Sequence, residues 1–320
     1  FRAFYESALD EHGCFRRELG DQSLLFNTEH PDPNDPDHRL WVDDGYGLTD
    51  SKGNVHHFIA YYNQWAQWAN IFAAVESLSL AYAATSDRRY AHKAAVLLDR
   101  ISDVYPEMDY YPLGKMGLQH SHGGTLQGRI EGNIWEAFRA ELLAKGYDLI
   151  FDGIQGDEEL VRFATRQSER YRLGDKSSVA AICRHIEDHF LQEVFKSVQD
   201  GRINGNTGMT HTCLATAAIA LDRPGLSEQW LDWLFDPQYP AINANYPRHK
   251  DPVPWVMVQG LDRDGMGGEC GTYGLIWSQG MLSLAEILAA YPAYTRHDMV
   301  RDYPQLRQAV LVEARLNMLD

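Results

Sequence analysis

Residues 61–106 read YYNQWAQWANIFAAVESLSLAYAATSDRRYAHKAAVLLDRISDVYP, and this stretch decides the fold. Between 61 and 85, apolar and aromatic residues recur at steps of three or four, which predicts a long amphipathic helix. Ser86 and Asp87 can cap a second helix over 88–104, which stops at a Tyr-Pro pair because the residue before proline disfavours helical geometry. Together they predict an antiparallel helical hairpin.

The same periodicity continues toward the end of the chain and predicts more helices, mostly in pairs. They span 130–151, 157–167, 176–198, 206–220, 226–235, 272–290 and 299–318. Irregular segments separate them: an N-terminal segment at 1–57, a loop at 113–128 and a long stretch at 236–271. Serial hairpins joined by unequal loops are typical of α/α toroids. We therefore predict an all-α chain in which residues 58–320 form an incomplete α/α toroid, a barrel of antiparallel helical hairpins.

Composition limits the classes of function. The 320 residues are 44% hydrophobic, enough for a large core, and their formal net charge is −16. Nucleic acid is disfavoured as a partner because phosphates require a basic surface, whereas an anionic sugar can still bind a locally cationic cleft. No apolar stretch is long enough to predict a membrane span. The four cysteines are widely spaced and show no metal-ligand pattern.

Three junctions between a loop and a helix gather glycine, polar and aromatic residues. They are His120–Gly124, Asn204–Gly208 with His211 one turn later, and Gly267–Tyr273. Helix N-termini present free N–H groups and the positive end of the helix dipole, which suits a carboxylate ligand. A purely structural alternative remains open, in which the asparagines and threonine cap helices and the glycines form turns.

Four segments resemble the heparinase II/III-like polysaccharide lyases and their alginate lyase and dermatan sulfate epimerase relatives. They are residues 90–106, 131–152, the Asn-Thr-Gly at 206–208, and DGMGGECGTYG at 264–274. The resemblance spans about residues 60–290, by pattern more than by identity. It implies β-elimination of a uronate-containing polysaccharide, and a secreted or periplasmic protein. It also implies a C-terminal β-sandwich domain, in which a structural zinc is possible, so we expect this chain to be a fragment.

The resemblance assigns catalytic roles to individual residues. β-Elimination needs a neutralised carboxylate, a base at C5 and an acid for the departing O4. Asn206 is expected to bind the carboxylate, and Tyr273 to take or deliver a proton. Many relatives have histidine directly after this asparagine, whereas this chain has Thr207. The base therefore stays open between three other histidines, namely His211, His120 and His122.

Further residues near the junctions are candidates for substrate binding. Arg129 and Arg202 can pair with acidic groups, and Gln127 and Asn133 supply side-chain amides. Trp255, in a proline-rich loop, is the best candidate for an exposed platform on which a sugar ring stacks. Several other aromatic residues either stack on sugars or belong to the core, namely Tyr61, Tyr62, Trp65, Trp68, Tyr110, Tyr111, Trp135 and Trp277.

Other functions remain possible from the sequence. A glycoside hydrolase on the same scaffold would use two carboxylates about 5 to 9 Å apart, with Glu269, Asp264, Glu131 and Asp148 available. A uronate C5-epimerase shares the proton abstraction, and a glycan-binding module needs no chemistry. The His-Ser-His at 120–122 could chelate a metal, but no further ligands stand at suitable spacing, so we predict no metal or cofactor in this chain. The oligomeric state stays open.

Overall fold

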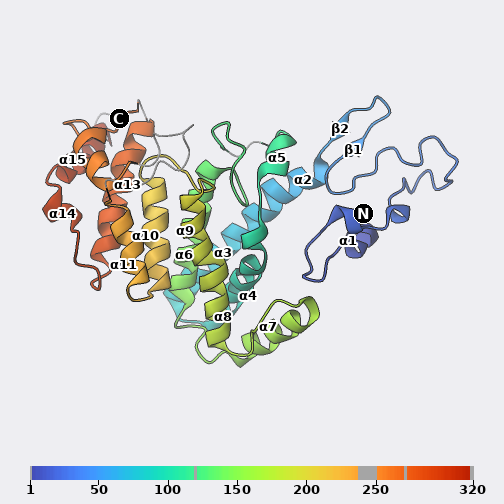
Figure 1. Cartoon of the computed structure of the whole chain (residues 1–320), viewed down its shortest axis with the longest axis horizontal. Helices are drawn as coiled ribbons and strands as arrows, with labels where there is room; N and C mark the ends of the chain where they lie inside the picture. The colour runs from blue at the N-terminus through green and yellow to red at the C-terminus, as the bar shows by residue number, and fades with distance from the viewer. Residues whose placement is uncertain (1, 119–120, 237–250, 270–271, 318–320) are drawn as a thin grey trace.

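The described chain is mostly helical, which confirms the all-α prediction. The computed structural model describes residues 2–118, 121–236, 251–269 and 272–317 (Figure 1). Its α-helices are α1 (Arg2–Ser7), α2 (Phe58–Tyr62), α3 (Trp68–Thr85), α4 (Arg88–Val104), α5 (Tyr111–Lys115), α6 (Asn133–Ile150), α7 (Glu158–Tyr171), α8 (Val179–Ile186), α9 (Gln192–Gln199), α10 (Met209–Leu221), α11 (Leu226–Trp233), α12 (Val253–Trp255), α13 (Thr272–Ala289), α14 (Met299–Asp302) and α15 (Leu306–Asn317).

Shorter elements complete the described part of the chain, and their numbers refer to that part alone. Three π-helical turns, Asn63–Gln67, Glu187–Leu191 and Val256–Gly260, join α2 to α3, join α8 to α9 and extend α12. Three 3-10 turns span Arg17–Leu19, Gln22–Leu24 and Tyr105–Glu107. Strands β1 (Leu48–Thr49) and β2 (Val55–His56) pair antiparallel, with Leu48 opposite His56. None of the described helices is both long and apolar enough to cross a membrane.

Capping residues fix where several helices start. The Asp87 carboxylate accepts a hydrogen bond from the Arg89 backbone N–H at the start of α4, and Asp157 accepts one from the Leu160 N–H in α7. Such bonds satisfy amide groups that have no partner inside the helix. α3 ends at Ser86, whose left-handed φ of 57° turns the chain directly into α4. The predicted hairpin between these two helices is confirmed.

Four long helices, α3, α6, α10 and α13, lie side by side in that order. Neighbouring members run in the same direction. Near the starts of α3 and α6, the Arg139 guanidinium lies 4.8 Å from the Phe72 ring centroid, and further along both helices the Ser79 hydroxyl donates to the Gly146 carbonyl. We call this set the parallel layer. Its members therefore begin at a common end of the molecule.

Helices α6, α10 and α13 also run in the same direction as one another. A Cβ on Gly205 would lie 3.1 Å from the Ala137 Cβ, and one turn or more later the Thr212 hydroxyl donates to the Glu141 carboxylate. Gly208 packs against Gly280 of α13. A second set of helices covers the parallel layer: α4 packs on α3, α6 and α8, while α9 and α11 pack on α10. The core lies between the two sets.

The structure corrects several predicted boundaries. α10 starts at Met209 instead of 206, because the chain turns through Gly208 at a φ of 99° just before the helix. The helix predicted over 299–318 is two helices, since Pro304 cannot continue the first one and restricts the residue before it. The stretch 236–271 contains α12 and a π-helical turn among its described residues, and α5 overlaps the loop predicted at 113–128.

Candidate functional site

The three junctions singled out in the sequence meet at the end where the parallel layer begins. Ser121 accepts a hydrogen bond from the Ile134 N–H through its carbonyl, which holds the first junction at the start of α6. The Asn204 N–H donates to the Asn133 carbonyl at 2.9 Å, which brings the second junction to the same place. The third leads directly into α13. Helix N-termini that share one end add their positive dipole ends there, which favours an anionic ligand.

Asn206 lies at this end, directly before α10. It is 9% exposed, and its backbone N–H contacts the Met209 sulfur at 3.1 Å. Asn206 does not cap the helix, since Gly208 occupies that position. Among the described residues, none forms a hydrogen bond with the Asn206 side-chain amide. The amide is therefore available to a ligand.

Tyr273 stands in the first turn of α13 and is 57% exposed. It shares a helix face with Ile276 and Gly280, which follow at three and seven residues. Because Gly280 packs against Gly208, Tyr273 lies about 10 Å of helix from the contact that holds Asn206. Glu269, in the loop before α13, is exposed. The structure thus places Asn206 and Tyr273 at the same end, on adjacent helices.

The contacts of His211 favour its structural interpretation. Its Nδ1 accepts a hydrogen bond from the Gly208 N–H, and its Nε2 donates to the Asp251 carbonyl at 2.8 Å. Burial lowers the pKa of His211 to about 4, because a charged imidazolium loses its hydration there. Both ring nitrogens are used in holding the start of α10, which disfavours His211 as the base.

The other two histidines lie on the first junction. His120 is outside the described residues. His122 is half-buried, and its Nδ1 accepts hydrogen bonds from the Gly124 and Leu126 N–H groups, at 3.1 and 3.2 Å. These bonds fix the proton of the neutral ring on Nε2. His122 therefore keeps one ring nitrogen for a substrate.

Arg129 is an internal residue, which corrects its expected contact with substrate. It is 3% exposed, and its guanidinium donates to Glu193, to the Ser197 hydroxyl and to the carbonyls of Tyr105 and Pro106. This network uses the guanidinium to hold the loop before α6. Arg202 is half-buried and makes one long contact, 3.4 Å, to the Met108 carbonyl. Of the two arginines, Arg202 is the one still free to meet an acidic group.

Amide side chains collect beneath the site. The Asn133 N–H donates to the Gln127 carbonyl at 2.8 Å, so backbone bonds link Gln127, Asn133 and Asn204 in series. The side-chain oxygens of these three residues and the Thr207 hydroxyl are buried without a partner in the described part of the chain. Buried acceptors without donors are costly, so this cluster calls for hydrogen-bond donors such as water or hydroxyl groups. Asn204 was singled out in the sequence only as part of the second junction, without a role of its own.

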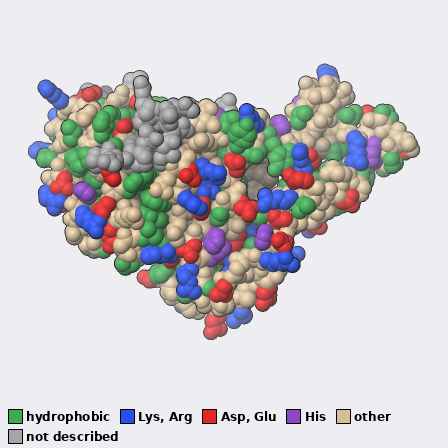
Figure 2. All heavy atoms as spheres, in the orientation of Figure 1, with side chains coloured by type: hydrophobic (Ala, Val, Ile, Leu, Met, Phe, Trp, Pro, Cys, Tyr) green, Lys and Arg blue, Asp and Glu red, His purple; other side chains and the backbone are tan. Residues whose placement is uncertain are grey.

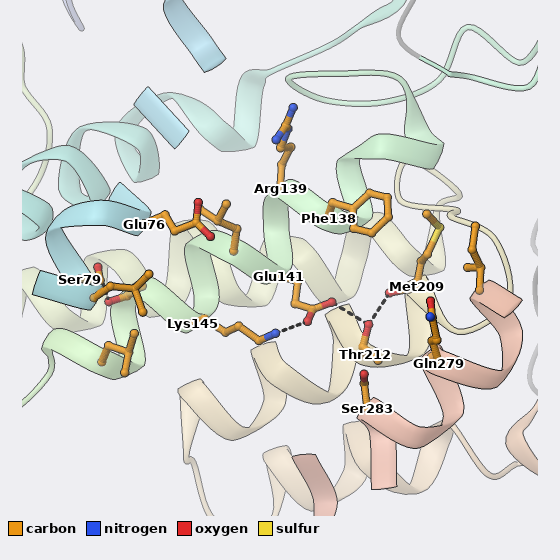
Figure 3. A pocket seen from close by; sticks show the side chains of 16 residues that line it. Glu76, Ser79, Phe138, Arg139, Glu141, Lys145, Met209, Thr212, Gln279 and Ser283 are labelled. Atoms are coloured by element: carbon orange, nitrogen blue, oxygen red, sulfur yellow. Dashed lines mark hydrogen bonds and ion pairs between the residues drawn. The ribbon is translucent and has the colours of Figure 1, made fainter. Parts of the chain in front are cut away.

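A groove of about 490 Å³ runs along the parallel layer below the site (Figure 3). Figure 3 shows side chains from all four helices around it, with Lys145 bonded to Glu141 and Glu141 accepting from Thr212. Its apolar part includes the exposed side chains Leu80, Phe138 and Leu149. Glu141 could not be singled out from the sequence, because its partners come from different turns and helices.

Trp255 differs from its prediction as an exposed platform. It is half-buried in α12 and packs against the core. By contrast, Trp135 in the first turn of α6 is 38% exposed. Trp135 therefore replaces Trp255 as an aromatic surface close to the site.

Two of the carboxylates proposed for a hydrolase, Glu131 and Asp148, do not form the pair that such an enzyme requires. Glu131 is buried and held by two hydrogen bonds from Arg139, at 2.9 and 3.3 Å. Asp148 lies in the last turn of α6, so most of this 18-residue helix, about 25 Å, separates it from Glu131. A retaining or inverting pair needs about 5 to 9 Å. Asp264 and Glu269 are exposed in the loop before α13.

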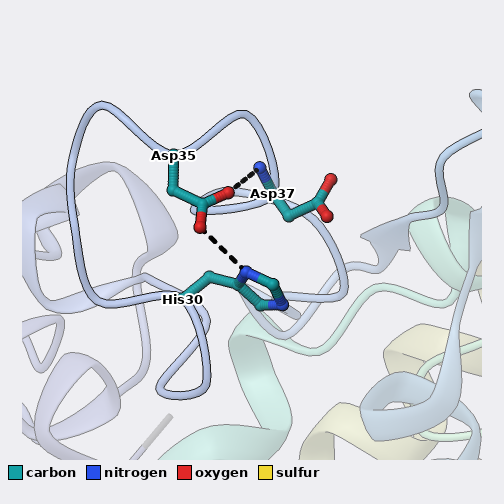
Figure 4. A group of neighbouring side chains, drawn as sticks. All are labelled: His30, Asp35 and Asp37. Carbon is teal, nitrogen blue, oxygen red and sulfur yellow. Dashed lines mark hydrogen bonds and ion pairs between the residues drawn. The ribbon is translucent and has the colours of Figure 1, made fainter.

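Two groups of metal-ligating side chains occur in the described residues, both away from the site. In the first, His30 Nδ1 lies 3.0 Å from Asp35, with Asp37 beside them (Figure 4). The second contains Asp99, Asp103 and His185. There, the buried Lys176 ammonium bonds to both aspartates, at 2.8 and 2.6 Å, and takes the place of a cation.

Neither family models, nor curated proteins, nor solved structures gave a match to this chain.

Proposed function

We propose that this chain is the helical catalytic portion of a polysaccharide lyase, folded as an incomplete α/α toroid. In this proposal the parallel layer is the inner wall of the toroid and the covering helices are its outer wall. The substrate is a polysaccharide that contains uronic acid. The observation that carries the proposal is the placement of Asn206 and Tyr273 at one end of the parallel layer, on neighbouring helices.

The proposed chemistry assigns one role to each side chain. The Asn206 amide donates to the uronate carboxylate, and the nearby helix N-termini stabilise the negative charge that grows on it during the reaction. A base removes the C5 proton, the C4–O4 bond breaks, and an acid protonates O4. The products are a new chain end and a sugar with a C4–C5 double bond.

Tyr273 is the proposed acid. His122 carries the proton of its neutral ring on Nε2, so its proposed role is to donate a hydrogen bond to the uronate and not to act as the base. Tyr273 can also perform both proton transfers in turn, as a phenolate and then as a phenol. Its exposure supports this role because the hydroxyl must reach a polymer that lies across the end of the helices.

The proposal is tested by ultraviolet absorbance, because only elimination produces the conjugated double bond. The protein is mixed separately with alginate, hyaluronan and chondroitin. We expect absorbance to rise with at least one polymer and to fall by at least 100-fold in Asn206→Ala and Tyr273→Phe. Tyr61→Phe, which alters another exposed tyrosine, is the matched control and should retain full activity. No rise with any of the polymers would reject elimination.

An epimerase remains the second candidate, since the same groups can return a proton to C5 from the other face. It would exchange the C5 hydrogen for deuterium from solvent without any change in absorbance. Proton NMR of the same polymers in heavy water separates the two activities.

A further inference from the structure

A second cavity, of about 660 Å³, opens between the N-terminal segment and the start of α3. We call it the arm cleft. One wall comes from residues 2–46 and the other from α2, the π-helical turn that follows it, and α5. Figure 2 shows the N-terminal segment extending from the helical body, with acidic and basic side chains interspersed over both. The segment is anchored at its base, since the Arg100 guanidinium donates to the Gly13 carbonyl and Arg16 pairs with Glu107.

Aromatic rings form one wall of the arm cleft. Tyr5 stacks on Phe15 with ring centroids 5.3 Å apart and planes 12° apart, and Phe15 stacks on Tyr46 at 6.5 Å and 24°. Tyr5 is 40% exposed, so the row is open to solvent at this end, whereas at the other end the Arg17 guanidinium lies 4.9 Å from the Tyr46 ring centroid. Flat, partly exposed aromatic rings bind the apolar faces of sugar rings, with a hydroxyl at hand for hydrogen bonding.

Side-chain amides stand on the opposite wall. The π-helical turn places Asn63 and Gln67 on the cleft. Both residues are exposed, and their side-chain amides form no hydrogen bond with described residues. Between them, the Gln64 amide is used internally and donates to the Ile130 carbonyl. π-Helical turns interrupt the regular hydrogen bonding of an α-helix and are frequent at functional sites. Free amides opposite stacked rings can bind sugar hydroxyls by donating and accepting at once.

Charge and position also suit a glycan. The exposed charged side chains that line the arm cleft are Arg2 and Asp109, one of each sign, because Arg129 is buried and paired with Glu193; the whole chain carries −16. The loop at 127–133 separates the arm cleft from the candidate functional site: Ile130 faces the π-helical turn, and Gln127 and Asn133 join the amide cluster. A polymer bound across the ends of the helices can therefore reach both.

We propose that the arm cleft is a second glycan-binding subsite, which holds a sugar residue of the polymer several units from the bond that breaks. Its volume lies within the range of about 300–1,000 Å³ that small-molecule sites occupy. This inference rests on the proposed function, because it takes the polymer of the elimination reaction as its ligand. It predicts that long oligosaccharides bind more tightly than short ones.

The test compares oligosaccharide binding in two variants of the full chain. Both carry Tyr273→Phe, so that no cleavage occurs during the titration. One adds Asn63→Ala and Gln67→Ala; the matched control adds Gln229→Ala, which removes an exposed side-chain amide of α11 that does not line the cleft. The ligands are an octamer and a dimer of whichever polymer is cleaved, or of mannuronate when none is.

Calorimetry should show octamer affinity about tenfold weaker in the double amide variant than in the control, since two hydrogen bonds are lost. Dimer affinity should be equal in both. Equal octamer affinity, or no octamer binding in the control, would overturn the arm cleft as a glycan site and leave the ultraviolet result untouched. A difference in octamer affinity without any ultraviolet signal would instead reject elimination and retain the cleft. Equal melting temperatures of the two variants confirm that both are folded.

Discussion

Glu136 is a buried carboxyl group one turn into α6, directly behind the candidate site. It accepts hydrogen bonds from the Tyr105 hydroxyl at 2.9 Å and from the Glu131 N–H at 2.8 Å. Burial is the main cause that raises its pKa to about 7, because the ionised form loses its hydration. Between pH 4.5 and 7 the folded protein therefore holds a proton that the unfolded chain has released.

This difference makes the contribution of Glu136 to stability fall as pH rises through that window, by about 3 kcal/mol for a shift of this size. Glu136→Gln removes the titration and keeps the contacts, since its carbonyl can accept from Glu131 and its amide can donate to the Tyr105 oxygen. Urea unfolding at pH 4.5 and pH 7 should show the variant gaining stability relative to the unmodified protein. A constant difference between the two proteins would contradict the raised pKa.

For single residues, the sequence predicted which positions lie at the candidate site better than it predicted what each side chain does there. Asn206 and Tyr273 were singled out because they match the polysaccharide lyase pattern at two junctions between a loop and a helix, and the structure places both at one end. Arg129 was misjudged because its partners, Glu193 and Ser197, are more than 60 residues away and leave no local pattern. Trp255 was misjudged because a proline-rich stretch can also begin a short helix.

Two glycines set the distance between α10 and α13. A Cβ on Gly280 would lie 2.4 Å from the Gly208 Cα, and a Cβ on Gly208 would meet the same backbone. The two helices can approach this closely only because neither residue has a side chain. Their contact holds Tyr273 at a fixed position relative to Asn206.

Gly280→Ala should therefore destabilise the protein by about 1 to 3 kcal/mol, as overpacking does, and should lower elimination activity further than stability alone explains. Gly268→Ala is the control, because its added Cβ would have no neighbour closer than 3.8 Å. Thermal unfolding measures the first effect, and initial rates at saturating polymer measure the second. Normal stability of the Gly280 variant would mean that α13 can move away without cost.

Helix periodicity was enough to predict most elements, because an apolar face every three or four residues is a local property. The break at Pro304 was also predictable from the restriction that proline places on the preceding residue. The parallel layer was not predictable, because the pattern of one helix does not indicate which other helices pack against it. Gly208 and Gly280, which are in contact, are 72 positions apart in the sequence. Pairing of this kind depends on the packing of all the helices at once.

The stability of the whole protein also depends on one buried ammonium group. Lys176, between α7 and α8, is fully buried and bonds to Asp99 and Asp103 of α4. Lys176→Met would leave the Asp99 carboxylate buried without a cation among the described residues, while Asp103 keeps Arg100 and His185, at a cost of about 3 to 5 kcal/mol. Lys145→Met breaks a half-exposed pair with Glu141 and should cost less than 1 kcal/mol. Urea unfolding measures the free energy of unfolding of the two variants. Similar losses in both would show that the buried Lys176 contributes no more to stability than the half-exposed Lys145.

The four helices of the parallel layer lie in one row, and this arrangement affects which of them can open locally. α6 and α10 have a neighbour of the layer on either side, whereas α3 and α13 stand at its edges. In a row of this kind each interface contributes separately, so the edges can open while the centre stays closed. Backbone amide hydrogens should then exchange with deuterium slowest in α6 and α10 and faster in α13 and α15. Tyr273 would belong to the part of the molecule that opens first, and Asn206 to the part that opens last.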